Sequence, residues 1–546
     1  MKNLWLESKN VPDYLKDEIR AMDSEQLTRR FQTNLEFGTG GLRGILGAGT
    51  DRMNVMTIRQ ATLGFAKYLK ANYDGEIKVA IGYDSRHYSV EFSEQAAVVL
   101  ASLGIKTLIY DQVKPTPLLS FAVREFGCQG GIMITASHNP KEYNGYKVYN
   151  DTGAQANLEQ SQQIIDEINN IEDITSIDFD SFQTVLDNEM VAYIDESFDD
   201  VYLKALEGIE KTNEQKKDVK IVFSPAHGTS GVIGPKVLNH FGYNNIIEVK
   251  EQMIPDGDFT HMTSANPEDL AAYDLALEYA KANDGDVIVV NDPDADRLGV
   301  MFKNRGGEYI AYSGNQIGTL LIDYIRNNTD LDSSYSMYNT IVTGQMGTEI
   351  IKEAGVNFKQ TLVGFKFIGE QIANNPDKNF VFGYEESYGY LLSDIVRDKD
   401  AMQSLLIVAE MVNYYLNRDL YLDEVMEELY QKYGYYIDVT KSIAYSGDEG
   451  LDKIKRIMKH FTETEVTAFA GHKVLTKIDY ASGIDDLPKA NVIKFELEEL
   501  GWVVFRPSGT EPKIKTYLSI KGASFADSEA TLEAIYQEIV TCFDSL

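Results

Sequence analysis

Short apolar runs alternate with polar clusters along most of the chain. Runs rich in β-branched residues end in glycine or polar residues in "VAIGYDSR" from Val79, "IVFSPAHGTSG" from Ile221, "VIVVNDPDADR" from Val287 and "FVFGYEESYG" from Phe380. Segments such as "VEFSEQAAVVLASLG" and "GNQIGTLLIDYIRNN" have the spacing of helices. Strands that alternate with helices predict α/β units with mostly parallel sheets, in which function gathers at the carboxyl ends of the strands.

The two ends of the chain follow other patterns. The first 36 residues predict amphipathic helices, and the glycine-dense "FGTGGLRGILGAGTDRMN" comes next. Near the other end, "NVIKFELEELGWVVFRPSGTEPKIKTYLSI" alternates in the manner of antiparallel strands and precedes the helical "DSEATLEAIYQEIVTCF". This end predicts a small α+β domain. At roughly 150 residues per domain, 546 residues correspond to about three or four domains.

The composition narrows the possible partners. A formal net charge of −33 argues against nucleic acid and anionic membrane as partners, because both require a basic surface. Cys128 and Cys542 are too few for a disulfide framework and indicate a reducing compartment. The N-terminus lacks the apolar core of a signal peptide, and no apolar run reaches the roughly 18 residues of a membrane span. We therefore expect a cytoplasmic protein.

Three carboxylates follow one strand at a spacing of two in "NDPDADRLGV". Asp292, Asp294 and Asp296 would repel one another, and a hard divalent cation with oxygen ligands would offset the repulsion. An EF-hand is excluded, because Arg297 and Lys303 stand where that loop needs Gly and Glu. The stretch predicts a metal site.

A serine follows another apolar run in "GIMITASHNPKEYNGYK". Ser137 lacks the G-x-S-x-G context of a hydrolase nucleophile, and "EESYG" is only a near miss. A serine that accepts and donates a phosphoryl group fits better, since the metal site could bind the phosphoryl oxygens. Arg43, Arg297, His138 and Lys147 could supply the cations and the proton carrier.

Two later stretches indicate ligand binding. In "FRPSGTEPKIKTY", small residues and one arginine after a strand favour an anion such as phosphate; the residues are Arg506, Ser508, Gly509 and Thr510. In "FGYEESYGY", Glu385 and Ser387 suit the hydroxyls of a sugar.

Five stretches together resemble the α-D-phosphohexomutase superfamily in order and spacing. They are "FGTGGLRG", "TASHNPKEYNGYK", "DPDADR", "GYEESYG" and "RPSGTEPK", so the resemblance runs from about residue 37 to the end. The "EESYG" loop, the chain length and the N-terminal preface are similar to the phosphoglucomutase subgroup, which also includes phosphopentomutases.

The resemblance implies a fold of four domains around a central cleft, each supplying one loop. We expect three α/β domains with mixed or parallel sheets at residues 1–204, 205–312 and 313–432, and an α+β domain at residues 433–546.

The resemblance also implies roles for single residues. The catalytic residues would be Ser137 as phosphoserine, Arg43 and Arg297 for the transferring phosphoryl group, and Lys147 with His138 for acid/base work. One Mg²⁺ would be bound by Asp292, Asp294, Asp296 and an oxygen on Ser137. The substrate would be bound by Glu385, Ser387, Lys366, Arg506, Ser508, Gly509 and Thr510.

The implied activity is the interconversion of glucose 1-phosphate and glucose 6-phosphate, with glucose 1,6-bisphosphate as intermediate and activator. A small sugar phosphate is then the expected partner, and the oligomeric state stays open. The alternatives are a phosphopentomutase acting on ribose 1-phosphate, another hexose phosphomutase, a metal-dependent sugar phosphatase and a non-catalytic binding protein.

Overall fold

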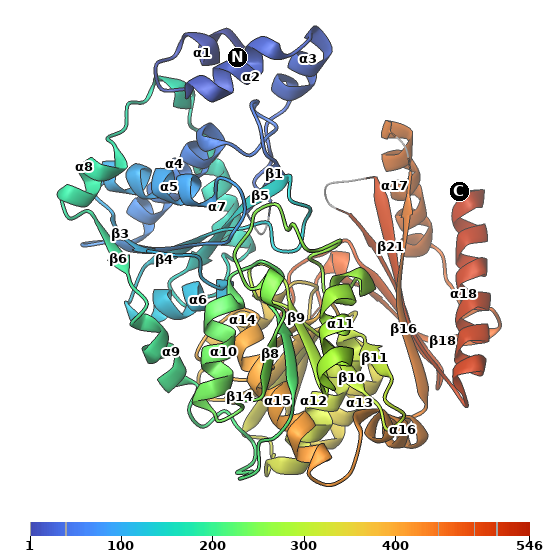
Figure 1. Cartoon of the computed structure of the whole chain (residues 1–546). Helices are drawn as coiled ribbons and strands as arrows, with labels where there is room; N and C mark the ends of the chain where they lie inside the picture. The colour runs from blue at the N-terminus through green and yellow to red at the C-terminus, as the bar shows by residue number, and fades with distance from the viewer. Residues whose placement is uncertain (1, 39–40, 446, 485, 509–511) are drawn as a thin grey trace. The chain divides into compact units, whose positions relative to one another are not determined.

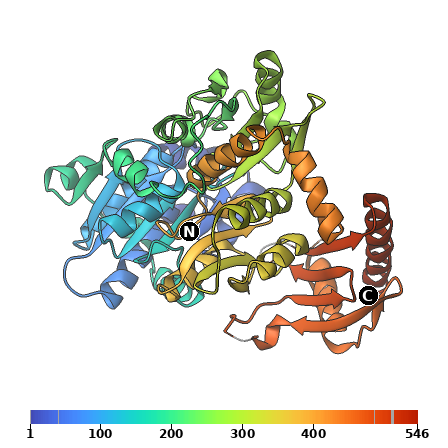
Figure 2. The same cartoon turned by 90° about the horizontal axis from the view of Figure 1, so that it is seen from below.

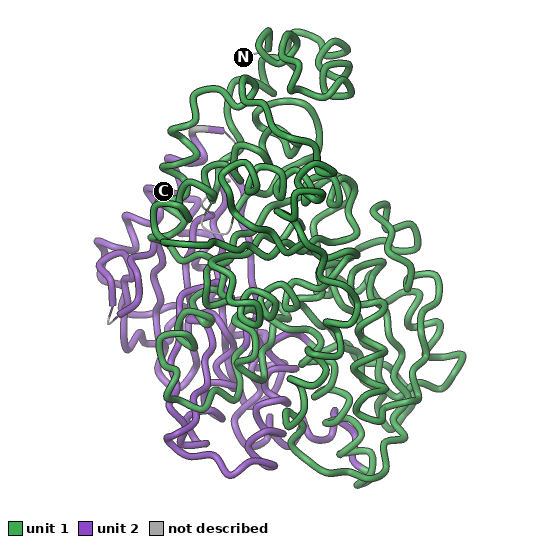
Figure 3. The backbone as a smooth tube through the Cα atoms, turned by 90° about the vertical axis from the view of Figure 1, so that its left-hand side faces the viewer, with its two compact units in different colours: residues 1–312, 365–383, 387–419 green, residues 313–364, 384–386, 420–546 purple. Residues whose placement is uncertain are grey.

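The chain divides into two units, each made of several stretches of sequence. The structure is a computed structural model that describes residues 2–38, 41–445, 447–484, 486–508 and 512–546. Unit 1 comprises residues 1–312, 365–383 and 387–419, and unit 2 comprises residues 313–364, 384–386 and 420–546 (Figure 3).

The first part of unit 1 is an α/β sheet domain preceded by three short helices. Its sheet has the order β1-β5-β4-β2-β3-β6, in which β4, β2, β3 and β6 are parallel, while β5 and β1 are antiparallel to their neighbours. Helices α4 and α5 cover one face of the sheet and α6 covers the other (Figure 1). The elements are α1 (Lys2–Glu7), α2 (Asp13–Ala21), α3 (Ser24–Gln32), β1 (Leu42–Ile45), α4 (Val55–Asn72), β2 (Lys78–Tyr83), α5 (Ser89–Ser102), β3 (Lys106–Tyr110), α6 (Thr116–Glu125), β4 (Gly130–Ile134), β5 (Tyr143–Asn150), α7 (Leu158–Asn169), α8 (Phe182–Asp187), β6 (Val191–Ile194) and α9 (Phe198–Ala205).

The helical preface predicted for the first 36 residues is confirmed. Trp5, Leu15 and Ile19 are buried and join the core of the first sheet domain. Helix α3 begins with a capping box, in which Asp23 accepts from the Gln26 backbone and the Gln26 side chain accepts from the Asp23 backbone.

The second part of unit 1 contains a sheet of order β11-β10-β9-β7-β8. The central strand β9 is buried along its whole length, which explains its continuous apolar sequence. Strand β10 runs antiparallel to β9, and Leu298 pairs with Asn291 where the connecting loop begins and ends. The elements are β7 (Ile221–Ser224), α10 (Ser230–His240), β8 (Ile246–Glu248), α11 (Asp274–Asn283), β9 (Val287–Asn291), β10 (Leu298–Lys303) and β11 (Tyr309–Tyr312).

The following stretch, residues 313–433, contributes to both units. In unit 2, β12 and β13 pair in parallel, as predicted for α/β units. In unit 1, helix α15 is buried at almost every position. The elements are α12 (Gly314–Asn328), β12 (Tyr335–Thr340), α13 (Gln345–Glu353), β13 (Asn357–Thr361), α14 (Phe365–Asn374), β14 (Asn379–Glu385), β15 (Gly389–Leu391), α15 (Ala401–Leu416) and α16 (Leu422–Tyr433).

The C-terminal part of unit 2 is an antiparallel sheet with two helices, as the alternating pattern predicted. The sheet order is β16-β21-β20-β19-β18-β17. Figure 2 shows this part of the chain in orange and red, beside the C-terminus. Phe461 and Phe543 from the helices pack with Phe495 and Phe505 from the strands in one core. The elements are β16 (Tyr435–Ala444), α17 (Gly447–Glu463), β17 (Ala468–Phe469), β18 (His472–Asp479), β19 (Ile493–Leu497), β20 (Gly501–Pro507), β21 (Lys513–Gly522) and α18 (Phe525–Ser545). The predicted class, α/β sheets followed by an α+β domain, is confirmed.

No helix in the described part of the chain combines the length and the apolar character needed to cross a membrane.

Candidate functional site

Ser137 lies in the turn that follows strand β4. The strand ends at Ile134, and Ser137 has a φ of 52°, a left-handed conformation that non-glycine residues seldom adopt. Its N–H donates to Thr135 Oγ1 at 2.8 Å, and the residue is 3% exposed. The turn therefore fixes the serine at the carboxyl end of a buried strand.

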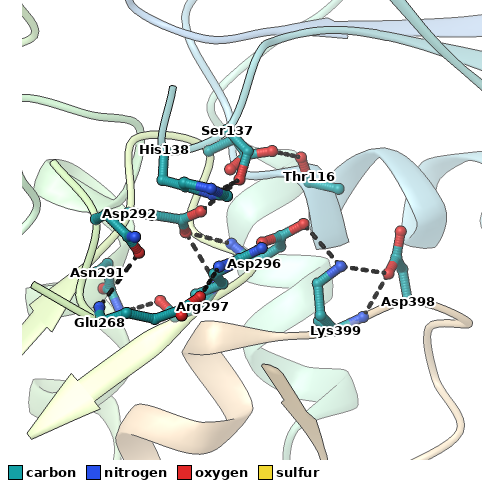
Figure 4. Close-up of polar contacts among 12 residues, drawn as sticks. Thr116, Ser137, His138, Glu268, Asn291, Asp292, Asp296, Arg297, Asp398 and Lys399 are labelled. Carbon is teal, nitrogen blue, oxygen red and sulfur yellow. Dashed lines mark hydrogen bonds and ion pairs between the residues drawn. The ribbon is translucent and has the colours of Figure 1, made fainter. Parts of the chain in front are cut away.

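The three aspartates lie in the loop that joins β9 to β10. Asp292 Oδ1 accepts hydrogen bonds from the N–H groups of Asp296 at 3.1 Å and Arg297 at 2.9 Å, which closes the loop. Asp292 Oδ2 accepts a hydrogen bond from Ser137 Oγ at 2.7 Å (Figure 4). Residues predicted separately from two strand ends therefore meet in one site.

The loop has the donors of a site for a hard divalent cation. Among the described residues, one oxygen each from Asp292, Asp294 and Asp296 lie within 4.8 Å of one another, and all three residues are buried. Asp294 Oδ1 and Asp296 Oδ1 are buried and accept no hydrogen bond from the described residues. Buried carboxylate oxygens without donors suit Mg²⁺, which prefers such ligands.

Two buried lysines balance part of this negative charge. Lys147 Nζ lies 2.8 Å from Asp294 Oδ2 and 3.4 Å from Asp296 Oδ2. Lys399 Nζ lies 3.0 Å from Asp296 Oδ2 and 3.4 Å from Asp398 Oδ1 (Figure 4). Lys147 stands on β5, whereas Lys399 immediately precedes the capped start of α15.

Burial and neighbouring charges shift the pKa values of the three aspartates in different directions. Burial, together with the charges of Asp294 and Asp296, raises the pKa of Asp292 well above its usual range. Burial also opposes ionisation of Asp294, but the ammonium of Lys147 outweighs it and lowers that pKa. For Asp296, burial and the charge of Asp294 are outweighed by Lys399 and Lys147, which also lower the pKa.

The pKa values of the two predicted proton carriers, His138 and Lys147, are shifted in opposite directions. His138 Nδ1 is 3.3 Å from Ser137 Oγ, and burial with the charges of Arg297 and Arg43 lowers its pKa to about 2. Burial opposes the charge on Lys147, but the carboxylates of Asp294 and Asp296 outweigh it and raise its pKa. The imidazole is therefore neutral and the ammonium is charged around neutral pH.

The two predicted arginines lie beside the serine turn and the aspartate loop, respectively. Arg43, on β1, donates from Nη1 to Asn139 Oδ1 at 3.1 Å, two residues beyond Ser137. Arg297 Nη1 forms an ion pair with Glu268 Oε1 at 2.6 Å. A carboxylate therefore fixes the direction of the Arg297 guanidinium.

Three residues of the site escaped the sequence analysis. Thr116 Oγ1 donates to Asp294 Oδ2 at 2.9 Å, and Lys399 and Asp398 form the ion pairs described above. The charged cluster "RDKD" directly before the apolar helix "AMQSLLIVAEMV" was a signal that could have identified Lys399.

A glycine lets a neighbouring loop brace the aspartate loop. The Thr229 N–H donates to the Pro293 carbonyl at 2.8 Å. A Cβ on Gly228 would stand 2.3 Å from the same carbonyl oxygen and 2.4 Å from Pro293 Cα. This contact therefore requires glycine at position 228.

The predicted sugar-binding residues fall in both units. In unit 2, Glu385 is buried, and its Oε1 accepts a hydrogen bond from the Gly364 N–H at 2.9 Å. In unit 1, the carbonyl next to Ser387, on Tyr388, accepts from the Leu298 N–H where the aspartate loop ends. Burial lowers the pKa of Lys366, also in unit 1, to about 8.

Part of the predicted phosphate loop is described, and it lies in unit 2. Arg506 Nη1 lies 3.5 Å from the Tyr517 hydroxyl, and the Ser508 N–H donates to the Lys513 carbonyl at 2.7 Å. Burial and the carboxylate of Glu386 raise the pKa of Tyr517, while Arg506 opposes them. The other two predicted residues, Gly509 and Thr510, lie outside the described residues.

Comparisons with known proteins agree along the chain. Residues 34–175, 200–307 and 313–433 match models of the α/β/α domains I, II and III of phosphoglucomutase/phosphomannomutase. The phosphoglucomutase of Staphylococcus epidermidis ATCC 12228 is 38% identical over 532 residues, which cover 95% of this chain and 96% of that protein. The phosphoglucomutase of Staphylococcus aureus MRSA252 is 38% identical over 553 residues, covering 98% of each chain.

A solved structure shows the same fold at lower identity. The open form of the exocytosis-sensitive phosphoprotein parafusin, a phosphoglucomutase from Paramecium, superposes with a TM-score of 0.70 at 18% identity, covering 94% of this chain and 95% of that one. The order of the motifs, the three matched domains and the near full-length similarity lead to one conclusion: the chain belongs to the phosphoglucomutase/phosphomannomutase family.

Proposed function

We propose that the chain is a phosphoglucomutase that interconverts glucose 1-phosphate and glucose 6-phosphate, as the names of its relatives suggest. The observation that carries the proposal is the hydrogen bond from Ser137 Oγ to Asp292 Oδ2 at 2.7 Å, which holds a hydroxyl nucleophile against a metal-type carboxylate cluster. A phosphoryl carrier needs this combination, because the charge on the transferring group must be neutralised.

The proposed reaction has two steps, and both break and form one phosphorus–oxygen bond. First, the 6-hydroxyl oxygen of glucose 1-phosphate attacks the phosphorus on Ser137, the bond from phosphorus to Ser137 Oγ breaks, and the sugar hydroxyl loses its proton while Oγ gains one. The glucose 1,6-bisphosphate then reverses its orientation. Second, Ser137 Oγ attacks the phosphorus at C1 and loses its proton, while the sugar oxygen that is released gains one.

The proposed roles in unit 1 follow from the contacts. Asp292, Asp294 and Asp296 would hold one Mg²⁺ together with an oxygen on Ser137, and the ion would supply positive charge to the phosphoryl oxygens. We assign proton transfer to Lys147 and His138, and stabilisation of the transferring group to Arg43 and Arg297. Each of these side chains contacts either the serine turn or the aspartate loop.

The proposed substrate contacts come from three stretches of the chain. The carboxylate of Glu385, with Ser387, would bind adjacent sugar hydroxyls, and Lys366 would support the same recognition. The phosphate that is not being transferred would be bound by Arg506, Ser508, Gly509 and Thr510.

We also propose the four-domain division at residues 1–204, 205–312, 313–432 and 433–546, and a cytoplasmic location, which suits the two free thiols.

Replacement of the nucleophile tests the proposal. Ser137→Ala removes the covalent path, so conversion of glucose 1-phosphate should fall by several orders of magnitude. Intact-mass measurement after incubation with glucose 1,6-bisphosphate should show a phosphate adduct that only the parent carries. Ser93→Ala is the matched control, because Ser93 is also buried, and among the described residues its hydroxyl donates only to the Val90 carbonyl within α5. Turnover near that of the parent in Ser137→Ala would disprove the mechanism.

A competition between substrates tests the sugar preference. A carboxylate such as Glu385 can accept hydrogen bonds from two adjacent hexose hydroxyls, and a site with such paired groups discriminates against substrates that leave them unpaired. We expect a higher kcat/KM for glucose 1-phosphate than for ribose 1-phosphate when both are present. Preferential conversion of the pentose would instead assign the chain to the phosphopentomutases.

A further inference from the structure

Arg86 lies at the centre of the turn that carries Ser137, although the proposed reaction gives it no role. It belongs to the "YDSR" cluster after strand β2, and its side chain is fully buried. Asp84 Oδ2 lies 3.2 Å from Arg86 Nε, and the Phe259 ring centroid lies 5.1 Å from Arg86 Cζ. The guanidinium is therefore held on its Nε edge and on one face.

In the described part of the chain, the terminal nitrogens of Arg86 donate only to backbone carbonyls of the serine turn and of the first residue of β5. Nη2 donates to the carbonyls of Ser137 and Asn139, both at 2.5 Å. Nη1 donates to the carbonyls of Pro140 at 2.9 Å and Tyr143 at 3.0 Å. The turn therefore wraps around one guanidinium, whose planar fork fixes four carbonyl directions at once.

The peptide groups on both sides of Ser137 are held by neighbours. Arg86 holds its carbonyl, and Thr135 Oγ1 accepts its N–H at 2.8 Å. Ser137 needs such support, because a left-handed φ of 52° is unfavourable for a non-glycine residue. Rotation of either peptide group would turn Oγ away from Asp292.

The hydrogen bonds of Arg86 leave its guanidinium no free terminal hydrogen. Its four terminal hydrogens are all used by the carbonyls, so none is left to bind a phosphoryl oxygen. This distinguishes Arg86 from Arg43, which is exposed and donates to a side chain.

We propose that Arg86 is a positioning residue that, together with Thr135, sets the direction of the Ser137 hydroxyl by holding the peptide groups around it. The inference rests on the proposed role of Ser137 as the phosphoryl carrier. Lysine cannot replace arginine here, because a single ammonium cannot satisfy four carbonyls arranged around a planar fork.

The test measures how fast glucose 1,6-bisphosphate phosphorylates Ser137, by rapid quench and intact mass, beside steady-state kinetics. Arg86→Lys keeps the charge but loses the fork, and a nucleophile misplaced by about 1 Å costs about 100-fold in rate. We expect kcat and the phosphorylation rate to fall about 100-fold, with KM for glucose 1-phosphate changed by less than about threefold. Thr135→Val, a smaller change to the same turn, should lower both rates about tenfold, roughly one lost hydrogen bond.

The matched control is Arg59→Lys. Arg59 donates to the Asn10 carbonyl and to Gln95 Oε1, both at 2.8 Å, away from the serine turn. Arg59→Lys should leave both rates within about twofold of the parent, because among the described residues the partly buried Arg59 has none of its hydrogen bonds to the serine turn.

Each outcome decides one question. A parent that takes up no phosphate on Ser137 would refute the proposed function itself. If the parent is labelled, then parent-like labelling by folded Arg86→Lys, or a loss that disappears when rates are referred to the folded fraction, would overturn the positioning role. If Arg86→Lys does not fold, Thr135→Val decides, and an unchanged labelling rate in that variant overturns the inference.

Discussion

Gly228→Ala should distort the aspartate loop without changing any of the three residues proposed to bind Mg²⁺. The new Cβ would stand 2.3 Å from the Pro293 carbonyl oxygen and 2.4 Å from Pro293 Cα, both backbone atoms that cannot rotate away. Ordinary contact between such atoms is about 3.5 Å, so one of the two loops must move by about 1 Å. Pro293 stands between Asp292 and Asp294, and any movement of its peptide group moves their carboxylates.

The size of the effect follows from that displacement. A displacement of about 1 Å in reacting or coordinating groups costs about 100-fold in rate, and overpacking of this kind costs about 1–3 kcal/mol of stability. We therefore expect kcat about 100-fold below that of the parent and a higher Mg²⁺ concentration for half-maximal activity. KM for glucose 1-phosphate should change little, because Gly228 is not among the residues proposed to bind the sugar or the phosphate.

The assay couples formation of glucose 6-phosphate to a dehydrogenase over a series of Mg²⁺ concentrations, with melting temperatures measured in parallel. Gly306→Ala is the control, because Gly306 lies in an exposed turn where the nearest atom to a new Cβ is the flexible Asn304 Oδ1 at 3.2 Å. If Gly228→Ala keeps the parent's kcat and Mg²⁺ dependence, the loop from Pro225 to Thr229 does not brace the aspartate loop.

Three further predictions concern charge. Asp294→Asn removes an anionic ligand, so activity should fall more than about 100-fold and calorimetry should detect weaker Mg²⁺ binding; parent-like activity in excess chelator would exclude the metal role. Lys399→Met removes a cation beside Asp296, so the variant without metal should have a lower Tm than the parent. Added Mg²⁺ should raise the Tm of the variant more than that of the parent, and an equal rise would contradict the role of Lys399 as a counter-charge. Burial raises the pKa of Asp438 from 3.8 to about 6, so the folded state takes up a proton that the unfolded chain does not, and stability falls as the pH rises from about 4 to 6. Asp438→Asn should lack this loss of about 3 kcal/mol, and its Tm relative to the parent should rise over that range rather than stay constant.

The parts that sequence reasoning could predict are those whose signal is local. The apolar run of β9 followed at once by alternating aspartates places Asp292 at a strand end, and the run of β4 does the same for Ser137. The carboxyl ends of strands in neighbouring sheets can meet, and the contact of these two side chains at 2.7 Å is the result. Helical spacing likewise identified the preface and the C-terminal helix.

The residues that sequence reasoning missed depend on contacts with residues that are distant in the chain, and a sequence does not show such contacts. Lys399 matters because its ammonium reaches Asp296, which is distant in the chain, and no local spacing relates the two. Arg86 escaped for another reason: its partners are carbonyl oxygens, which every residue carries, so their arrangement exists only once the turn has folded. The same holds for Gly228, whose need for a missing side chain is created by Pro293.

The discontinuity of unit 1 has a consequence for biosynthesis and for dissection of the gene. A nascent chain of 312 residues already contains Asp292, Asp294, Asp296 and Lys147. It lacks Lys399, which is synthesised later, in the last segment of unit 1. Until then, Asp296 has one ammonium partner instead of two. In the same loop, the carboxyl of Asp292 already resists ionisation. An expression fragment cut at residue 312 would keep all three aspartates and still lack the counter-charge of the intact chain. A fragment that restores this charge must include residues 387–419, in the same polypeptide or as a second one, and the rest of unit 1 is completed by residues 365–383.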